Sequence, residues 1–490
     1  MKEQTDIDKN ITNIDATELS VLVANKTVSC VDIMNAFLAR IHAFNPKLNA
    51  IVALRPDDEL LAEAKTADEQ LSRGWLHGLP IAIKDLSETA GILTTWGSPM
   101  YATYVPEADC DMVQRIKAAG AIVIGKTNTP EFGLGSHTYN PVYGATVNPY
   151  NTNRSAGGSS GGAAAALSAR MLPIADGSDM MGSLRNPAAF CNIYGFRPSA
   201  GLLPTEALPR TWEPFPLATH GPMGKSIKDV AALLDTMSTP ADKHTSYDWR
   251  SGSFYQAVAT AQSNSMQGLR IAWLGNLGGQ LPIEAGILEL CQNALQDLAS
   301  LGFNVHSLDL NAGLTDGEQA LHAKDLFESW SVLRSRRIAY AFRQLYLKPG
   351  TREQMKPELQ WEVERGLAMS ESDMSSAFSI NQRWHTRVNN LFSQTDLLCL
   401  PSAAVFPFDA QMTWPTHISK ATMQTYHEWM SVVIPASLQG LPTLAVPAGF
   451  NNDGLPAGIQ LMGKHGDDIR VLRAGQLYHQ ATGWPQIKMP

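Results

Sequence analysis

A tract of small residues places the tightest constraint on how this chain can fold. Residues 155–162 read Ser-Ala-Gly-Gly-Ser-Ser-Gly-Gly, and four alanines follow at 163–166. Four glycines around two serines leave almost no side-chain volume to bury, so another part of the protein must approach this backbone closely. Because glycine permits tight turns and alanine favours helix, the tract predicts a glycine loop that runs into a helix.

Three functional interpretations compete for this loop with one structural alternative, a flexible linker. An anion-binding loop would hold phosphate on backbone N–H groups, but neither GxxxxGK[ST] nor GxGxxG after a strand is present. Gly157, Ser159 and Gly161 satisfy GxSxG, yet the nucleophile elbow needs a strand directly before its serine, and residues 148–154 are polar loop residues. A flexible linker does not fit, because a hydrophobic helix follows at once. The third interpretation takes the tract together with two others.

The two other tracts are Gly-Leu-Pro-Ile-Ala-Ile-Lys-Asp at 78–85 and Asp-Gly-Ser-Asp-Met-Met-Gly-Ser-Leu-Arg at 176–185. Ser159 lies 75 residues after Lys84 and 24 residues before Ser183. With this order and spacing, the sequence resembles the amidase signature family over most of its length. The resemblance implies an enzyme that hydrolyses amides, in which Ser183 forms the acyl-enzyme, Ser159 is a bridging serine on a cis peptide, and Lys84 is the base.

The chemistry of such a site places a condition on its lysine. A serine hydroxyl is a poor nucleophile until a base takes its proton, and the three tracts contain no histidine. Lysine can serve only when it is uncharged, so burial must lower its pKa from about 10.4 by several units. The apolar run at 79–83 would bury the stem of Lys84. An ordinary surface pair of Lys84 with Asp85 is the alternative, and the three ordered tracts favour the base.

A tetrahedral intermediate also needs backbone N–H donors directed at its oxyanion. By resemblance, this oxyanion segment consists of Met180, Met181, Gly182 and Ser183. The family commonly has glycine where this chain has Met181, so we expect Met181 to form a wall of the substrate pocket, with core packing as the alternative. Arg185 is expected to pair with Asp179 or a nearby carboxylate and to hold the segment in place, with substrate binding as the alternative.

Aromatic residues outside the three tracts are candidates for the substrate pocket. They suit an amide with an apolar or aromatic portion, although aromatic residues are also common in cores. The candidates, besides Met181 and Tyr426, are Trp212, Phe215, Trp330, Trp414 and Trp429.

The pattern of apolar runs predicts the fold class. Short β-rich runs at 79–83, 121–124, 269–274, 396–400, 443–446 and 459–462 alternate with helical stretches. This alternation predicts a single α/β domain over residues 1–490, with a mixed central sheet covered by helices on both faces. Within it we expect an N-terminal helical layer at about 1–70, a signature core at about 75–235, and a helical insertion or cap at about 310–395.

Composition excludes several other classes of protein. Hydrophobic residues make up 44% of the chain and charged residues 17%, and the net charge is −8 without a basic stripe, so we expect a globular protein that does not bind nucleic acid. The five cysteines form no CxxC pair and the histidines no HExxH, which predicts reduced thiols and no metal or other cofactor. The polar N-terminus and the absence of a long apolar run predict a cytoplasmic protein without a membrane partner. A homodimer is left open.

Rival functions share the same motifs. The chain could be a glutaminase-type subunit of a tRNA-dependent amidotransferase, or an esterase or carbamate hydrolase that uses the same acyl-enzyme chemistry. As a different class, it could be a subunit whose glycine loop binds an anion without turnover. The aromatic residues favour aryl or medium aliphatic amides over free glutamine as substrates.

Overall fold

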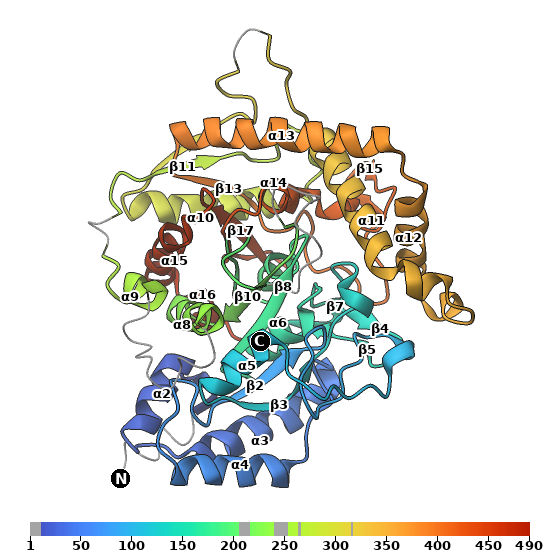
Figure 1. Ribbon diagram of the computed structural model, residues 1–490. Coiled ribbons are helices and arrows are strands. Elements are labelled where there is room, and N and C mark those ends of the chain that lie inside the picture. The colour runs from blue at the N-terminus through green and yellow to red at the C-terminus, as the bar shows by residue number, and fades with distance from the viewer. Residues whose placement is uncertain (1–10, 205–215, 240–252, 263–265, 315–316) are drawn as a thin grey trace.

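The computed structural model describes residues 11–204, 216–239, 253–262, 266–314 and 317–490. At its centre lies a mixed eight-stranded sheet (Figure 1). In it β11 pairs in parallel with β12 and β13, and the other neighbouring strands pair antiparallel. In spatial order the strands are β12 (Asn304–Ser307), β11 (Arg270–Trp273), β13 (Leu397–Pro401), β17 (Pro456–Met462), β16 (Thr443–Phe450), β9 (Tyr194–Arg197), β10 (Thr219–Gly224) and β8 (Ile174–Asp179).

Both faces of this sheet are buried, because alternate side chains of its strands enter two different hydrophobic clusters. In β13, Leu397 and Cys399 join one cluster, while Leu398 and Leu400 join the other. Helices pack into each cluster and cover the two faces, which confirms the predicted α/β fold with a mixed sheet. The first cluster includes α8 (Ile227–Ser238), α10 (Ile287–Ser300) and α15 (Asp468–Thr482); the second includes α7 (Arg185–Phe190), α11 (Ala323–Leu347), α13 (Glu371–Gln394) and α14 (Ile434–Leu438).

A smaller three-stranded sheet carries Lys84. Its strand order is β1-β3-β2, and β2 runs parallel to β3 and contacts β8 of the large sheet. Helices surround this sheet at the N-terminal end of the molecule, coloured blue in Figure 1. The elements are α2 (Ala16–Ala24), α3 (Cys30–Leu48), β1 (Ile51–Val52), α4 (Asp57–Glu69), β2 (Pro80–Lys84), α5 (Asp111–Ala118), β3 (Ile122–Thr127) and α6 (Gly161–Ser168).

Three helices occupy most of the segment predicted as a cap. They are α11, α12 (Pro357–Ala368) and α13, and α11 packs against both of the others. The division of the single domain into a helical layer, a signature core and a cap stays a prediction. The remaining helices and paired strands are α9 (Ser253–Ala259), α16 (Trp484–Ile487), β4 (Tyr139–Asn140), β5 (Gly144–Ala145), β6 (Val147–Asn148), β7 (Asn151–Ser155), β14 (His417–Ile418) and β15 (Ala421–Thr422).

The N-terminal helices differ from the sequence pattern in one detail. The apolar spacing between residues 17 and 45 predicts a helical layer that stops at Asn45 and Pro46, whereas α3 continues through Pro46 to Leu48. The proline lies close enough to the helix end for the chain to tolerate its missing N–H, and Asn49 caps the helix in the left-handed conformation through a hydrogen bond to the carbonyl of Asn45. None of the described helices is both long and apolar enough to cross a membrane.

Candidate active site

Lys84 ends strand β2 and points into a ring of hydroxyl groups. Its side chain is buried, and its Nζ lies 2.7 Å from the Oγ of Ser159, 2.8 Å from that of Ser160 and 3.1 Å from that of Ser178. An uncharged amine has two N–H groups to donate and one lone pair that can accept. Three hydroxyl partners, each able to donate or accept, can therefore accommodate the uncharged amine as well as the ammonium.

Burial is the largest influence on the charge of Lys84. It lowers the pKa of the ammonium from 10.5 to about 7, against the opposing charges of Asp176 and Asp179. Asp176 receives a hydrogen bond from the backbone N–H of Lys84 at 2.9 Å, not from its Nζ. Without a carboxylate in hydrogen-bond contact, Nζ is free to lose its proton near neutral pH.

The glycine loop that carries Ser159 is packed as tightly as its composition predicts. Gly157 has φ +76°, and the peptide bond between Gly158 and Ser159 is cis. A Cβ at Gly161 would lie 2.4 Å from the Oγ1 of Thr138, which accepts the Gly161 N–H at 3.1 Å. The loop then continues directly into helix α6. The expected glycine loop before a helix is thus confirmed, but the polar loop expected at residues 148–154 is wrong, because strand β7 occupies residues 151–155 and pairs with β6.

The segment expected to bind the oxyanion, residues 180–183, lies between β8 and α7. Its backbone amides differ in whether they are hydrogen-bonded within the protein. Gly182 has φ +79° and donates its N–H to the Oδ1 of Asp179 at 2.9 Å. Within the described part of the chain, the backbone N–H groups of Met180, Met181 and Ser183 make no hydrogen bond. Three amides in this turn are therefore open to a ligand, while the fourth is bonded to the protein.

Ser183 follows the turn and lies beside the glycine loop. Its backbone carbonyl accepts the N–H of Ser160 at 3.2 Å, and the residue retains 8% of its exposure. Among the described residues, its Oγ has no hydrogen-bond partner. Met181, by contrast, is 3% exposed and belongs to the hydrophobic cluster that covers one face of the sheet.

Two buried arginines hold the carboxylate that orders this turn. Arg185 makes a two-pronged contact with Asp179, through Nε at 2.9 Å and Nη2 at 3.0 Å, and Arg197 adds a contact at 3.2 Å. Burial raises the pKa of the Asp179 carboxyl, but the two guanidinium groups outweigh it and hold that pKa well below its usual range. The predicted pair of Arg185 with Asp179 is confirmed, and it keeps the acceptor for Gly182 ionised.

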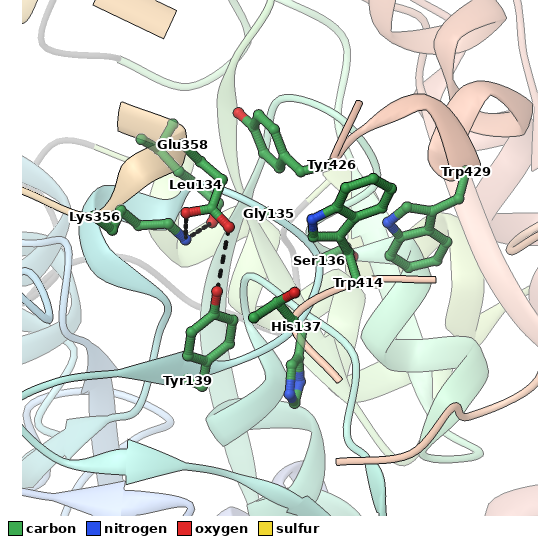
Figure 2. Close-up of a pocket in the computed structure, with 11 residues that line it drawn as sticks. Leu134, Gly135, Ser136, His137, Tyr139, Lys356, Glu358, Trp414, Tyr426 and Trp429 are labelled. Atoms are coloured by element: carbon green, nitrogen blue, oxygen red, sulfur yellow. Dashed lines mark hydrogen bonds and ion pairs between the residues drawn. The ribbon is translucent and has the colours of Figure 1, made fainter. Parts of the chain in front are cut away.

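A small pocket opens next to the glycine loop (Figure 2). Ser136 connects the two, because its Oγ donates to the carbonyl of Gly158 and accepts an N–H from Asn186 at 2.9 Å. Aromatic and polar side chains from three distant parts of the chain form the walls. The pocket is lined by Leu134, Gly135, Ser136, His137, Tyr139, Lys356, Glu358, Thr413, Trp414, Tyr426 and Trp429.

Only some of the residues predicted to form the substrate pocket line the pocket in the structure. Trp414 and Trp429 line this pocket. Trp330 is fully buried behind it, with its ring 5.4 Å from that of His427. Trp212 and Phe215 lie outside the described residues.

Several polar groups of the site have no motif of their own in the sequence. Ser160 and Ser178 also contact the Nζ of Lys84, at 2.8 and 3.1 Å, and their only signal is that they lie within the same tracts. Lys356 and Glu358 enter the pocket from the start of α12, where no motif marks them. In the part of the chain that the structure describes, no group of three or more histidine, cysteine, aspartate or glutamate residues could hold a metal ion.

Comparison with known proteins places this chain in a family. A family model described as Amidase matches residues 32–472. An acylamidase of Rhodococcus erythropolis is 31% identical over 492 residues, 98% of this chain and 98% of its own. One of the subunits of the glutamyl-tRNA(Gln) amidotransferase of Thermus thermophilus is 33% identical, over 97% of this chain and 98% of its own.

Solved structures agree with this placement. A bacterial aryl acylamidase of the amidase signature family superposes with a TM-score of 0.85 at 25% identity, covering 97% of this chain and 99% of the other. The 6-aminohexanoate cyclic dimer hydrolase shares the fold, with a TM-score of 0.81 at 24% identity over 97% of this chain and 98% of its own. The chain therefore belongs to the amidase family of amide-hydrolysing enzymes.

Proposed function

We propose that this enzyme hydrolyses a linear carboxylic amide to an acid and an amine through an acyl-enzyme on Ser183, with Ser159 as proton relay and Lys84 as base. The contact of the buried Lys84 Nζ with the Ser159 Oγ at 2.7 Å carries the proposal, because burial also leaves this amine partly uncharged near neutral pH. A serine hydroxyl needs such a base before it can attack a carbonyl carbon.

The contact of Lys84 with Ser159 supports the first half of the proposed proton path, and the family resemblance supports the second half, from Ser183 to Ser159. Lys84 takes the proton of Ser159 while Ser159 takes that of Ser183, and the Ser183 oxygen attacks the amide carbon. When the tetrahedral intermediate collapses, Ser159 gives its proton to the leaving amine and recovers one from Lys84. Water then attacks the acyl-enzyme by the same path, which releases the acid and restores all three residues.

The oxyanion of that intermediate would be stabilised by the open amides of the turn. These are the N–H groups of Met180, Met181 and Ser183, and loss of one such donor typically lowers the rate about 10²–10³-fold. Gly182 has a different role in this proposal, since its N–H is bonded to Asp179 and shapes the turn. The Asp179 carboxylate keeps this role at any pH where its two arginines hold it ionised.

Apolar groups around the serines support a substrate with an apolar or aromatic portion. A Cβ at Gly133 would lie 3.6 Å from the Ser159 Oγ and 2.8 Å from a methyl of Leu86, so a leucine side chain lies close to the relay serine. Trp414 and Trp429 add aromatic walls in the adjoining pocket. Such walls bind apolar acyl or amine groups by burying their surface.

Free glutamine is a less suitable substrate for this site. Its α-carboxylate would need an unpaired cation, and two cations that the structure describes beside the site, Lys356 and Arg334, have carboxylate partners. Lys356 lies 3.7 Å from Glu358, and Arg334, which contacts Met180, is 2.7 Å from Glu362. We therefore prefer amides of apolar acids to the glutaminase reaction of an amidotransferase, and esters and carbamates remain accessible to the same acyl-enzyme chemistry.

An anion-binding role without turnover also fits less well. Three backbone N–H groups at the helix end of the loop are bonded within the protein: Ser160 to the carbonyl of Ser183, Gly161 to Thr138, and Gly162 to the carbonyl of Asn128. An anion cradle needs these donors free. A cytoplasmic location, a homodimer and the absence of a nucleic-acid partner stay predictions.

A substrate panel with a covalent probe tests the proposal. The purified chain should hydrolyse p-nitroanilides and aliphatic amides faster than glutamine, and a serine-reactive phosphonate should label Ser183. Ser183→Ala should lose both turnover and labelling, whereas Ser300→Ala, at an exposed serine on α10, should keep both. Intact amide after long incubation, together with unlabelled Ser183, would refute the enzyme assignment.

A further inference from the structure

A buried carboxylate lies beside the lysine base, and no step of the proposed reaction uses it. Asp176 on β8 is fully buried, and its Oδ1 accepts the backbone N–H of Lys84 at 2.9 Å. Among the described residues, its Oδ2 makes no hydrogen bond. Buried polar groups are normally hydrogen-bonded, because an ionised group without donors is costly in the protein interior. Asp176 therefore carries a charge that its own hydrogen bonds satisfy only in part.

The geometry of β8 indicates how far this carboxylate lies from the amine of Lys84. Side chains two residues apart on a strand share one face and are separated by about 6–7 Å. Ser178, two residues after Asp176, contacts the Lys84 Nζ at 3.1 Å. The lysine side chain thus runs along this face of β8, from its backbone N–H at Asp176 to its Nζ at Ser178. The carboxylate is consequently about 6–7 Å from the amine, too far for a hydrogen bond but near enough for its charge to act.

This charge acts strongly on the base because both groups are buried. At an effective dielectric constant of about 20, a unit charge about 7 Å away shifts a pKa by between about one and two units. A negative charge favours the ammonium form of Lys84, so Asp176 raises the pKa of that amine and opposes the larger effect of burial. The carboxylate of Asp179 acts in the same direction.

The other ionisable groups around the base titrate outside the range in which it gains its proton. Asp179 stays ionised because its two arginines hold its pKa well below the usual range. Burial lowers the pKa of His220 on β10 to about 4, so this ring is uncharged near neutral pH. Burial lowers the pKa of Lys126 on β3 only to about 8, against the charge of Asp85, whose own pKa burial raises. Since Asp179 also shapes the turn at residues 180–183, Asp176 is the carboxylate whose charge can be removed without disturbing that turn.

We propose that Asp176 is a positioning residue that acts through Lys84: its Oδ1 anchors the backbone of the lysine on β8, and its negative charge sets the pH below which the amine stops acting as a base. The inference rests on the proposed function, in which Lys84 takes the proton of Ser159. Burial alone would make the amine a weak base that stays uncharged to low pH. With the carboxylate beside it, the amine is a stronger base that still loses its own proton near neutral pH.

Asp176→Asn tests the charge separately from the anchor, because the amide oxygen can still accept the Lys84 N–H. The measurement is kcat/KM for a p-nitroanilide between pH 5 and pH 9. The midpoint of the acid limb should move down by about one to two pH units. The ratio of kcat/KM in the variant to that in the wild type should therefore increase about tenfold from pH 8 to pH 5.5. General damage to the structure would lower kcat/KM by the same factor at every pH and leave the midpoint in place.

Three further variants make this result specific. Asp468→Asn is the matched control, because Asp468 on α15 is a buried aspartate that accepts a backbone N–H at 2.8 Å from Ser199, outside the three tracts, and it should keep the wild-type midpoint. Asp176→Glu retains the charge and should restore the midpoint even where it lowers the rate. If Asp176→Asn fails to fold, Asp176→Ser removes the same charge, leaves room for water and should give the same shift. A wild-type midpoint in a folded, uncharged variant at this position would overturn the inference.

Direct titration distinguishes failure of this inference from failure of the proposed function. The enzyme is labelled with carbon-13 at the ε position of lysine, and the NMR signal that is absent in Lys84→Met is followed with pH in the wild type and in Asp176→Asn. If the wild type hydrolyses the anilide but this signal titrates at the same pH in both proteins, only the inference is wrong. If no anilide is hydrolysed and the phosphonate leaves Ser183 unlabelled, the proposed function is wrong, and the NMR midpoints then decide whether Asp176 sets the charge of Lys84.

Discussion

Two buried lysines on neighbouring strands show why Lys84 and not Lys126 suits the role of base. Burial lowers the pKa of Lys126 to about 8, against the opposing charge of Asp85, so its charge alone does not disqualify it. Its Nζ, however, donates to the backbone carbonyl of Ser87 at 2.5 Å and contacts the hydroxyl of Thr89 at 3.0 Å, and neither residue belongs to the serine tracts. Lys84 instead contacts the hydroxyl of Ser159 in the glycine loop.

The pH dependence of kcat/KM should report the charge of Lys84. Because burial lowers its pKa from 10.5 to about 7, the amine is uncharged above neutral pH and becomes an ammonium as the pH falls through that value. An ammonium cannot take the proton of Ser159, so kcat/KM should decrease about tenfold for each pH unit below 7. A profile that stays flat down to pH 5, at an unchanged fraction of folded enzyme, would rule out a lysine base.

Substitution of single serines should rank the hydroxyls around Lys84. Ser183→Ala removes the nucleophile and should abolish phosphonate labelling, while Ser159→Ala leaves the nucleophile in place but breaks the relay and should slow labelling severely. Ser178→Ala removes only the longest contact of Nζ, at 3.1 Å, and should have the smallest effect. Labelling that survives Ser183→Ala but not Ser159→Ala would instead favour the nucleophile elbow. Labelling rates followed by mass spectrometry give the ranking.

The chain order of functional residues decides which of them a sequence can reveal. Lys84, Ser159 and Ser183 lie in three compact tracts with fixed spacing, so a motif marks each of them. The pocket instead draws on residues 134–139, 356–358 and 413–429, which only the folded chain brings together. Neither hydrophobic periodicity nor a motif predicts that these three segments come into contact. For this reason the sequence predicts the pocket only in part, at Trp414, Tyr426 and Trp429, and does not indicate Glu358 or Lys356.

Strand β8 depends on its partners and on a buried ion cluster at its end. The apolar runs of the sequence predict β2, β3, β11, β13, β16 and β17. They do not predict β8 (Ile174–Asp179) or β10 (Thr219–Gly224), because both are rich in glycine and polar residues. Six antiparallel residue pairs hold these two strands together, and Asp179 ends β8 between two buried arginines. Pairing and ion contacts here replace the hydrophobic signal that sequence patterns detect.

Asp179→Asn should test this cluster. The amide keeps the shape of the side chain but leaves Arg185 and Arg197 buried without their countercharge, and loss of one partner of a buried pair costs about 3–5 kcal/mol of unfolding free energy. Because the pKa of Asp179 is depressed in the folded state, its stabilisation is present above about pH 4 and is lost as the pH falls further.

Urea unfolding at several pH values provides the measurement. The difference between wild type and Asp179→Asn should shrink below about pH 4, the ordinary pKa of aspartate. Asp111→Asn serves as the control, because its partner Arg115 forms a pair in which Asp111 is 52% exposed, and its loss should cost less than about 1 kcal/mol. A small loss for Asp179→Asn at pH 7 would contradict the structural role of the cluster.

Arg334 on α11 connects the helices of the predicted cap to the turn at residues 180–183. Its Nε contacts Glu362 at 2.7 Å, its Nη2 reaches the hydroxyl of Tyr426 at 2.8 Å, and its Nη1 lies 2.9 Å from the sulfur of Met180. Lysine keeps the charge but lacks the planar fork needed for three partners. We expect Arg334→Lys to lower kcat about tenfold with little change in KM, because displaced catalytic geometry costs rate more than binding.

Steady-state kinetics on a p-nitroanilide measure this effect. Arg387→Lys is the matched control, since Arg387 is a buried arginine on α13 that pairs with Glu318 at 3.6 Å, away from the turn. The control should keep kcat. Equal loss of kcat in both variants would show that Arg334 acts on stability and not on the site.

At the scale of the whole molecule, the helices of the predicted cap share a core with the central sheet. Trp384 and Leu391 of α13 belong to the same hydrophobic cluster as Leu398 and Leu400 of β13. The Trp384 indole also donates to the carbonyl of Pro435 at 3.0 Å, which ties α13 to the start of α14. A segment that buries its apolar face in a common core cannot leave it without exposing that core to water.

Hydrogen exchange at increasing urea concentration should therefore show α13 (Glu371–Gln394) and β13 (Leu397–Pro401) losing protection together. Helix α4 (Asp57–Glu69) provides the comparison, because only Leu60, Ala64 and Ala67 of its residues are buried, and it should exchange at lower urea. Release of α13 well before β13 would mean that residues 310–395 unfold as a separate unit. In that case the cap would be an independent body, and the pocket wall at Glu358 would be free to move relative to Ser183.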